Sequence, residues 1–360
     1  MNDRTRLHGI LYLATFVSAA SCGGGDPDLP IQPSITVQTS GVSVRLQAVD
    51  VVDASVVWAS GLGGTFVRTV DGGTIWTAGV VPGADSLQFR DVHAVDANTA
   101  YLLSAGTGGQ SRIYKTVDAG HTWALQFENR EPQAFFDCMD FWDPVTGVAF
   151  SDAVDGQFII MRTEDGEQWR RVPPDDMPAA QPGEGSFAAS GTCLVTYGDS
   201  LGWIGTGAAD SARVLRTADR GRTWTAHATP IIGGQAAGIS AVAFKDAQSG
   251  VVAGGAIDRP DDWTDNVATS RDGGLTWQLG GRPTFTGAIY GMAYAGDGSS
   301  PALVAVGPKG ASYSGDDGTS WLALDTLDYW GIGFASVAAG WLAGPEGRIV
   351  KVSLAREGSE

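Results

Sequence analysis

Three carboxylates of this 360-residue chain could supply the acid pair of a glycoside hydrolase: Asp137, Asp152 and Glu184. Such an enzyme uses one carboxyl group as an acid and a second as a base or nucleophile, at a separation of about 5 to 10 Å. A separation in space cannot be read from spacing along the chain. The three residues are therefore catalytic candidates only if the protein is an enzyme.

The same carboxylates belong to a wider group of charged and aromatic residues suited to binding. Aromatic faces stack on sugars or side chains, and carboxylates accept hydrogen bonds from hydroxyls and amines. The predicted ligand-binding residues are Arg90, Asp137, Asp152, Glu184, Arg259, Tyr290 and Trp330. The alternative is that polar loops are ordinary in an acidic protein and that an aromatic residue at a strand start often seals a core.

Composition excludes several other chemistries. The chain has 40 acidic and 23 basic residues and a net charge of −17, so it repels nucleic acids and anionic lipid surfaces. Its histidines and cysteines lack the spacing of zinc or haem sites, and its glycine-rich pieces do not open a helix after a strand. The Asp-rich stretch 258–265 lacks the spacing of a calcium loop. We therefore expect no metal site and no cofactor.

The elements that must position these residues are indicated by a short turn that recurs six times. Each copy begins with Ser or Thr, has Asp two residues later and ends in Trp, with Gly between them to take the positive φ of a tight turn. The Asp and Trp of the copies are Asp71 and Trp76, Asp118 and Trp123, Asp165 and Trp169, Asp219 and Trp224, Asp272 and Trp277, and Asp316 and Trp321. The third copy is one residue short. We call these six segments the repeat turns.

The spacing of the repeat turns predicts the architecture. Their aspartates recur every 44 to 54 residues, which is the period of a four-stranded propeller blade. Alternating strands precede and follow each copy, so each repeat turn is expected to join the third strand of a blade to the fourth. We expect each Trp to pack against its own blade.

The repeat turns resemble the Asp-box, or BNR repeat, S/T-x-D-x-G-x-x-W, of sialidase-like β-propellers, over residues 65–325. The segments 135–143 and 185–191 are similar to secreted bacterial propellers related to the photosystem II assembly factor. The resemblance implies an all-β, seven-bladed β-propeller of four-stranded antiparallel blades. It also implies that the repeat turns lie at the periphery of one face and that functional loops gather on the opposite face.

The seventh blade needs a strand from elsewhere in the chain. After the last repeat turn, segments 331–334, 340–343 and 348–352 supply only three strands. Residues 34–39 alternate as a strand should, so we predict that they complete the seventh blade and close the ring, which removes exposed sheet edges. Residues 34–355 then form one propeller, followed by a tail at 356–360, and we expect a monomer.

The first 33 residues predict export. Arg4 and Arg6 precede an apolar run from Ile10 to Val17, as in a signal peptide over residues 1–21. Residues 19–22 resemble a bacterial lipobox, which implies a lipidated Cys22 and a flexible tether over residues 22–33. The alternative is ordinary cleavage after a small residue. The protein would be periplasmic or on the cell surface, in contact with a membrane only through this anchor.

Cys138 and Cys193 remain as a pair once Cys22 is assigned to the lipobox. They occupy nearly the same point of the first strand in adjacent blades, and an exported compartment permits oxidation. We predict a disulfide bond between them; two buried free thiols are the alternative.

These features favour a non-catalytic binding or scaffold propeller that recognises a glycan or protein partner on the face opposite the repeat turns. The alternative is a sialidase-like glycoside hydrolase acting on extracellular glycans. That enzyme would need an arginine cluster and a Tyr–Glu nucleophile pair. Arg112, Arg213 and Arg348 occupy equivalent third-strand positions away from the axis, and the chain offers no convincing nucleophile pair.

Overall fold

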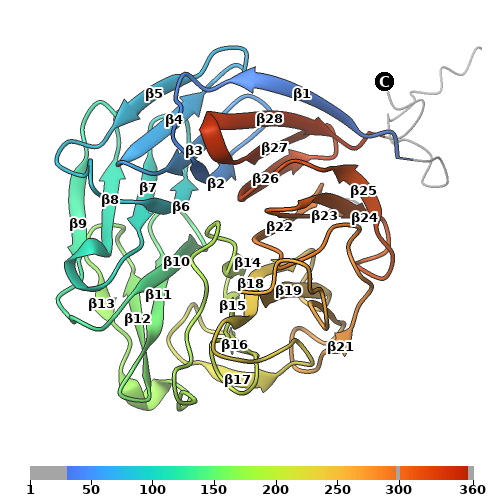
Figure 1. Cartoon of the computed structure of the whole chain (residues 1–360). Coiled ribbons are helices and arrows are strands. Elements are labelled where there is room, and N and C mark those ends of the chain that lie inside the picture. Colours follow the sequence, from blue (N-terminus) through green and yellow to red (C-terminus); the bar gives the residue numbers. More distant parts are fainter. Residues whose placement is uncertain (1–30, 297–300, 356–360) are drawn as a thin grey trace, which may run out of the picture.

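The computed structural model describes residues 31–296 and 301–355, which form a ring of seven four-stranded antiparallel sheets (Figure 1). This confirms the predicted seven-bladed propeller. In the described residues the only helical pieces are three short 3₁₀ turns, η1 (Gly108–Gln110), η2 (Pro174–Asp176) and η3 (Pro345–Gly347). Residues 1–30, which carry the predicted signal peptide, Cys22 and most of the tether, lie outside the described residues, as does the tail at 356–360.

In six blades the chain runs outward from the axis, one strand after the next. Blade 1 contains β2 (Leu46–Val51), β3 (Val57–Gly61), β4 (Thr65–Thr69) and β5 (Thr77–Val80); blade 2 contains β6 (Phe89–Ala94), β7 (Ala100–Ser104), β8 (Arg112–Thr116) and β9 (Ala124–Glu128); blade 3 contains β10 (Phe136–Phe141), β11 (Gly147–Val154), β12 (Gln157–Thr163) and β13 (Arg170–Arg171). Blade 4 contains β14 (Leu194–Tyr197), β15 (Leu201–Gly205), β16 (Arg213–Thr217) and β17 (Thr225–Ala228); blade 5 contains β18 (Ala237–Phe244), β19 (Gly250–Ala256), β20 (Val267–Ser270) and β21 (Gln278–Leu279); blade 6 contains β22 (Gly291–Ala295), β23 (Ala302–Gly307), β24 (Gly310–Ser314) and β25 (Leu322–Asp325).

Blade 7 is completed by the N-terminal strand, as predicted. β1 (Ser34–Thr39) pairs antiparallel with β28 (Arg348–Ser353), outside β27 (Ala339–Ala343) and β26 (Gly331–Ser336). Figure 1 shows this strand, in blue, lying against the red strands of the C-terminus. The first and last segments of the propeller therefore share one sheet, which closes the ring.

One side chain of the closing strand fastens blade 7 to blade 1. The Gln38 Oε1 accepts hydrogen bonds from the indole Nε1 of Trp76 at 3.1 Å and of Trp341 at 3.0 Å. The Gln38 amide nitrogen donates to the carbonyl oxygen of Gly72 at 3.0 Å. Trp76 and Gly72 belong to the first repeat turn, so the closing strand binds that turn directly.

The repeat turns hold their shape through the hydroxyl and carboxylate that define them. In the fifth copy the Ser270 Oγ accepts from the Gly274 N–H at 2.9 Å and donates to Asp272 Oδ1 at 2.8 Å. Asp272 Oδ1 also accepts from the N–H groups of Leu275 and Thr276, at 3.1 and 2.9 Å. The side chains therefore satisfy backbone donors inside the turn, as their residue types indicated.

The tryptophans of the repeat turns pack between two blades, which corrects the prediction that each would pack against its own. In the third copy, Trp169 lies in one cluster with Tyr101 of blade 2 and Phe141 of blade 3. Clusters shared by two neighbouring blades make up the apolar core of the described residues, and a repeat-turn Trp lies in or against six of them. A blade buries its two faces only against its neighbours, so a large ring at its outer edge loses most water in the gap between blades.

The repeat-turn aspartates predict how the fold responds to acid. Hydrogen bonds from Thr122 lower the pKa of Asp118 to about 2, and hydrogen bonds from Thr276 lower that of Asp272 to about 2. Because these folded-state pKa values lie below those of the unfolded chain, the stability they provide is complete above about pH 4 and is lost towards pH 2. We expect the melting temperature to fall steeply between those values, and to fall less in an Asp118→Asn, Asp272→Asn variant. A melting temperature that stays constant down to pH 2 would contradict this.

Candidate functional site

The inner strands of four blades carry a bulge at equivalent positions. The pairing register shifts between Leu46 and Ala48, Phe89 and Asp91, Phe136 and Cys138, and Ile239 and Ala241. A bulge leaves one residue out of the ladder and redirects its side chain. The residues passed over are Gln47, Arg90, Asp137 and Ser240, and the last three of them line one cavity.

This cavity, the axial pocket, has a volume of about 290 Å³ and lies where the inner strands begin. In an antiparallel blade, the loop that enters the first strand and the loop between the second and third strands both lie at that end, and the repeat turns lie at the other. The pocket therefore opens on the face opposite the repeat turns. It brings together five of the seven predicted ligand-binding residues: Arg90, Asp137, Asp152, Tyr290 and Trp330.

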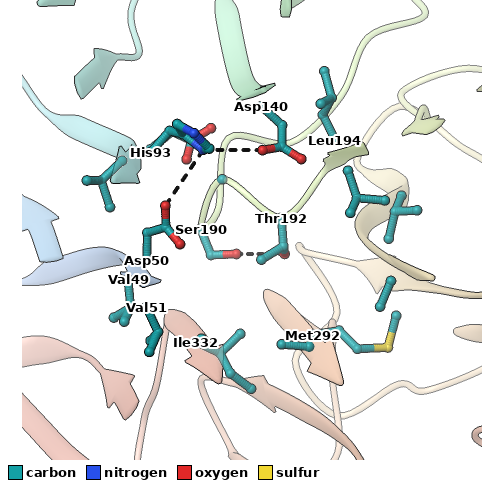
Figure 2. Close-up of a pocket in the computed structure, with 18 of the residues that line it drawn as sticks. Val49, Asp50, Val51, His93, Asp140, Ser190, Thr192, Leu194, Met292 and Ile332 are labelled. Atoms are coloured by element: carbon teal, nitrogen blue, oxygen red, sulfur yellow. Dashed lines mark hydrogen bonds and ion pairs between the residues drawn. The ribbon is translucent and has the colours of Figure 1, made fainter. Parts of the chain in front are cut away.

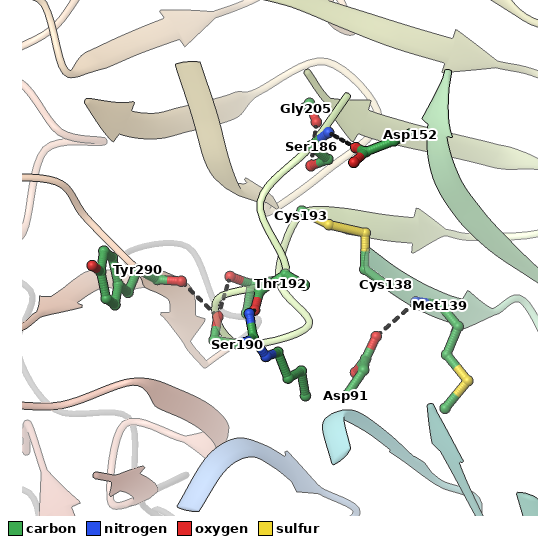
Figure 3. The surroundings of a disulfide bond; sticks show 12 residues. Asp91, Cys138, Met139, Asp152, Ser186, Ser190, Thr192, Cys193, Gly205 and Tyr290 are labelled. Atoms are coloured by element: carbon green, nitrogen blue, oxygen red, sulfur yellow. Dashed lines mark hydrogen bonds between the residues drawn. A yellow bond between two sulfur atoms is a disulfide. The ribbon is translucent and has the colours of Figure 1, made fainter. Parts of the chain in front are cut away.

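Residues 185–192, the axial segment, cross the middle of the ring between two cavities. Ser186–Ala189 line the axial pocket, and Ser190–Thr192 line a second cavity beyond it. Blades 3, 5 and 6 hold the segment: the Ser186 N–H donates to Asp152 Oδ1 at 2.9 Å, the Thr192 carbonyl accepts from Val242, and the Ser190 Oγ donates to the Tyr290 carbonyl at 2.7 Å (Figure 3). The segment thus forms the floor of the pocket.

A disulfide bond fixes the end of the axial segment. Cys138, on β10 of blade 3, is joined to Cys193, which directly follows the segment and precedes β14 of blade 4 (Figure 3). Their Cα atoms are 6.1 Å apart, and both side chains are buried. The inner strands of two blades and the pocket floor are therefore covalently connected.

Two carboxyl groups meet in the wall of the pocket. Asp137 and Asp152 hydrogen-bond each other, and only 1% of Asp137 is exposed. Burial raises the pKa of Asp137 well above its usual value, and the charge of Asp152 raises it further. Burial also raises the pKa of Asp152, to about 6. The pair therefore holds a proton between its two carboxyl groups near neutral pH.

Two arginines give this part of an acidic protein a local positive charge. The Arg90 Nη1 donates to the Ala188 carbonyl at 3.1 Å, and its Nε and Nη2 bind the Gln88 Oε1. Burial lowers the pKa of Arg90, and the nearby charge of Arg45 lowers it further. The guanidinium of Arg45 lies 4.0 Å above the ring of Trp330. Arg90 retains N–H donors that these contacts do not use.

Aromatic rings complete the wall opposite the carboxyl pair. The rings of Tyr290 and Trp330 pack edge to face with centroids 4.8 Å apart. Both residues are partly buried, and each directly precedes an inner strand, β22 or β26. The pocket therefore combines an apolar surface with donors from Arg90 and a carboxyl pair, as recognition sites commonly do.

Two of the predicted residues do not reach the pocket. Glu184 is fully buried, and its carboxylate binds the Arg213 guanidinium and accepts from the Thr206 hydroxyl at 2.7 Å. Arg259 lies on the exposed loop between β19 and β20 and pairs with Asp262 at 2.8 Å. Both make internal ion pairs, one in the core and one on the surface.

The geometry is unfavourable for a two-carboxylate hydrolase. The carboxyl groups of Asp137 and Asp152 touch, whereas that mechanism needs them about 5 to 10 Å apart with the substrate between. Glu184, the third candidate, is sealed by its pairing with Arg213. Among the three third-strand arginines, Arg112 pairs with Glu128 and Arg348 donates to the Asp328 carbonyl, so they do not form a cluster.

The second axial cavity, of about 340 Å³, lies beyond the axial segment on the side of the repeat turns (Figure 2). His93 Nδ1 lies 3.4 Å from Asp140 Oδ1 and 3.7 Å from Asp50 Oδ2. Each aspartate accepts a backbone hydrogen bond from the inner strand of the next blade: Asp50 from Ala94 at 2.6 Å, Asp91 from Met139 at 2.6 Å, and Asp140 from Thr196 at 2.7 Å. These carboxylates clamp neighbouring blades together, which accounts for their positions.

A third hollow, of about 550 Å³, lies beside the repeat turn of blade 3. Its wall includes Arg162, Glu164 and Arg222, with both arginines bound to Glu164 at 2.7 and 3.0 Å. Those charges are already paired on the surface. The axial pocket differs because it holds a buried carboxyl oxygen, Asp137 Oδ2, that has no hydrogen-bond partner.

The structure adds pocket residues that the sequence analysis missed. Ser240 and Phe187 line the cavity, and Arg45 covers Trp330 from outside it. Aligning the blades on their repeat turns would have found Ser240, because it occupies the same inner-strand position as Arg90 and Asp137. Arg45 offers no such signal, since it lies in the loop between β1 and β2.

Neither a metal centre nor a membrane-spanning helix is present in the described part of the chain. No group of three or more His, Cys, Asp or Glu residues there could hold a metal ion. Within the same residues, no helix is long and apolar enough to cross a membrane.

Comparison with known proteins relates the chain to others through its fold. No family model and no curated protein sequence matches it. A solved structure described as YCF48 bound to D1 peptide is similar with a TM-score of 0.61 and 15% identity, over 94% of this chain and 99% of that one. YCF48 from Cyanidioschyzon merolae is similar with a TM-score of 0.61 and 15% identity, over 89% of this chain and 99% of that one. The shared feature is the seven-bladed propeller.

Proposed function

We propose that this protein is a non-catalytic propeller that binds a peptide segment of a protein partner in the axial pocket. The observation that carries the proposal is the convergence of Arg90, Asp137, Asp152, Tyr290 and Trp330 on one cavity opposite the repeat turns. The solved structure with a D1 peptide bound to the similar propeller YCF48 supports a peptide as the ligand class. A rigid ring suits this role because it holds the pocket residues in place before binding.

The charges favour a peptide segment with an anionic group. The chain as a whole is strongly acidic, yet Arg45 and Arg90 lie together beside the pocket. A carboxylate could accept from the unused Arg90 donors while an apolar side chain rests on Tyr290 or Trp330. We therefore propose an acidic side chain or a free carboxyl terminus as the group that binds next to Arg90.

The remaining sequence-based expectations fit this function and stay part of the proposal. Export and lipidation of Cys22 would place the pocket at a bacterial cell surface or in the periplasm, on a tether at residues 22–33. The repeat turns would make the chain a member of the Asp-box propellers, and it would act as a monomer. A glycan is the other ligand class suited to an aromatic wall, and the experiment below includes it.

A charge reversal in the pocket tests the proposed function. A random heptapeptide library and a glycan array are screened against the full chain, and the tightest peptide is measured by fluorescence anisotropy. Arg90→Glu is expected to weaken binding of that peptide at least 30-fold, because it removes donors and adds repulsion. Arg271→Glu makes the same charge change at an exposed position in a repeat turn and should leave the affinity within about twofold. Equal losses in both variants, or binding to glycans alone, would overturn the proposal.

A further inference from the structure

We propose that the Asp137–Asp152 carboxyl pair takes up a proton when an anionic group binds beside Arg90, so that binding in the axial pocket weakens as the pH rises. This inference rests on the proposed function in that it concerns the same pocket and an anionic ligand. It adds a regulatory property, since the affinity would then follow the acidity of the surroundings.

The geometry of the pair is the first support. Asp152 Oδ1 accepts from the Ser186 N–H at 2.9 Å, which fixes that carboxyl group against the pocket floor. Its other neighbour is Asp137, whose Oδ2 is buried and has no partner. A Cβ atom at Gly185 would lie 1.8 Å from Asp152 Oδ1, so the backbone there leaves room only for that carboxyl group. Two carboxyl groups held in contact cannot both ionise without strong repulsion.

The charges that face the pair are few and come from identifiable elements. Arg90 on β6 is the cation that favours ionisation of Asp137. The axial segment contributes backbone groups, through Ser186 and Ala188. Arg45 and Tyr290 face Arg90 from the other side, and Asp328 faces Tyr290. The nearby guanidinium of Arg213 is neutralised by Glu184. Arg90 is thus the one cation shared by the pair and a bound anion.

Competition for Arg90 produces the proton uptake. While the pocket is empty, Arg90 offsets the charge of an ionised pair. An anion that binds Arg90 takes over that interaction and adds its own repulsion, so the pair is driven towards its protonated form. The pKa of Asp152, about 6, sets the range in which the pair changes charge in the empty pocket.

The sign and size of the effect follow from linkage. A site that binds one more proton with ligand than without loses affinity as the pH rises, by at most about tenfold per pH unit. We expect the affinity for an anion to fall about tenfold in total between pH 5 and pH 8, with most of the change above pH 6. A cationic ligand group would give the opposite slope, because an ionised pair would attract it.

The experiment measures binding of two probes between pH 5 and pH 8. One probe is the tightest heptapeptide from the library, and the other is trifluoroacetate, a carboxylate that stays ionised throughout and whose binding is followed by the indole N–H resonance of Trp330. Asp152→Asn should flatten the profile by removing the ionisable partner. Asp175→Asn, at an exposed position of η2, is the matched control and should keep the tenfold fall.

The outcomes separate this inference from the proposed function. Peptide binding that is independent of pH, or that strengthens as the pH rises, overturns the inference and leaves peptide binding intact. Trifluoroacetate binding that weakens with pH in the absence of any peptide binding sustains the inference and overturns the peptide function. Failure of both probes to bind at pH 5 overturns both. If Asp152→Asn does not fold, the wild-type profile and Asp137→Asn decide.

Discussion

Replacing Cys138 and Cys193 together by alanine is expected to lower the free energy of unfolding by about 4 kcal/mol. The disulfide closes a stretch with a sequence separation of 55 residues, and in the chain-entropy description a loop of that size is worth about 4 kcal/mol. Two further contributions oppose each other only weakly, because alanine fills these buried positions poorly and leaves no polar group unpaired. Chemical denaturation of the oxidised wild type and of the double variant measures the difference.

The same variant should also weaken peptide binding, because the bond anchors the floor of the axial pocket. Reduction of the wild-type protein provides the matched control, since it breaks the bond without changing any residue volume. The reduced wild type should unfold near the double variant. A loss below about 1 kcal/mol in both would contradict a structural role for the bond.

Gln38→Ala is expected to cost about 3 kcal/mol and to open the ring at its closure. The substitution leaves the indole N–H groups of Trp76 and Trp341 and the carbonyl of Gly72 without partners. Trp341 is fully buried and Trp76 is 9% exposed, so water cannot replace the lost hydrogen bonds at low cost. Thr36→Ala, at an exposed position of the same strand, is the control and should change stability by less than about 0.5 kcal/mol.

Hydrogen exchange distinguishes ring opening from general loosening. Pairing between β1 and β28 depends on the closing strand staying in place, so the amides of β28 should exchange faster in Gln38→Ala. Amides of β10, on the far side of the ring from this sheet, should keep their protection relative to global unfolding. Uniform acceleration in all blades would contradict a specific role of Gln38 in closure.

The architecture could be predicted because its signals are local and repeated. A turn that satisfies its own backbone donors needs the same residue types in every blade, so Asp71 and its five counterparts mark the period directly. The closing strand could also be predicted, because a blade with three strands leaves one edge unpaired and residues 34–39 were the remaining alternating segment. The packing of Trp169 and its counterparts was predicted wrongly, because local sequence does not specify which neighbouring blade a ring contacts.

The candidate site was less accessible from sequence, since it depends on contacts between blades. Arg90 and Trp330 could be proposed because they lie at blade entrances, where loops converge on the axis. Glu184 shares that location, but its charge is taken by Arg213 in the same blade, a pairing that spacing alone does not reveal. The contact between Asp137 and Asp152 likewise arises only when the bulge on β10 turns Asp137 towards β11.

The place at which a bound peptide sits is the most direct test of this account. A photoreactive benzoylphenylalanine is introduced in place of Ile257, an exposed residue at the rim of the axial pocket, and separately in place of Phe334, which lines the second cavity on the repeat-turn side. Irradiation with the selected heptapeptide should give a covalent product at position 257 and none at position 334. A product at position 334 alone would mean that the ligand binds on the repeat-turn side, and would contradict the central claim.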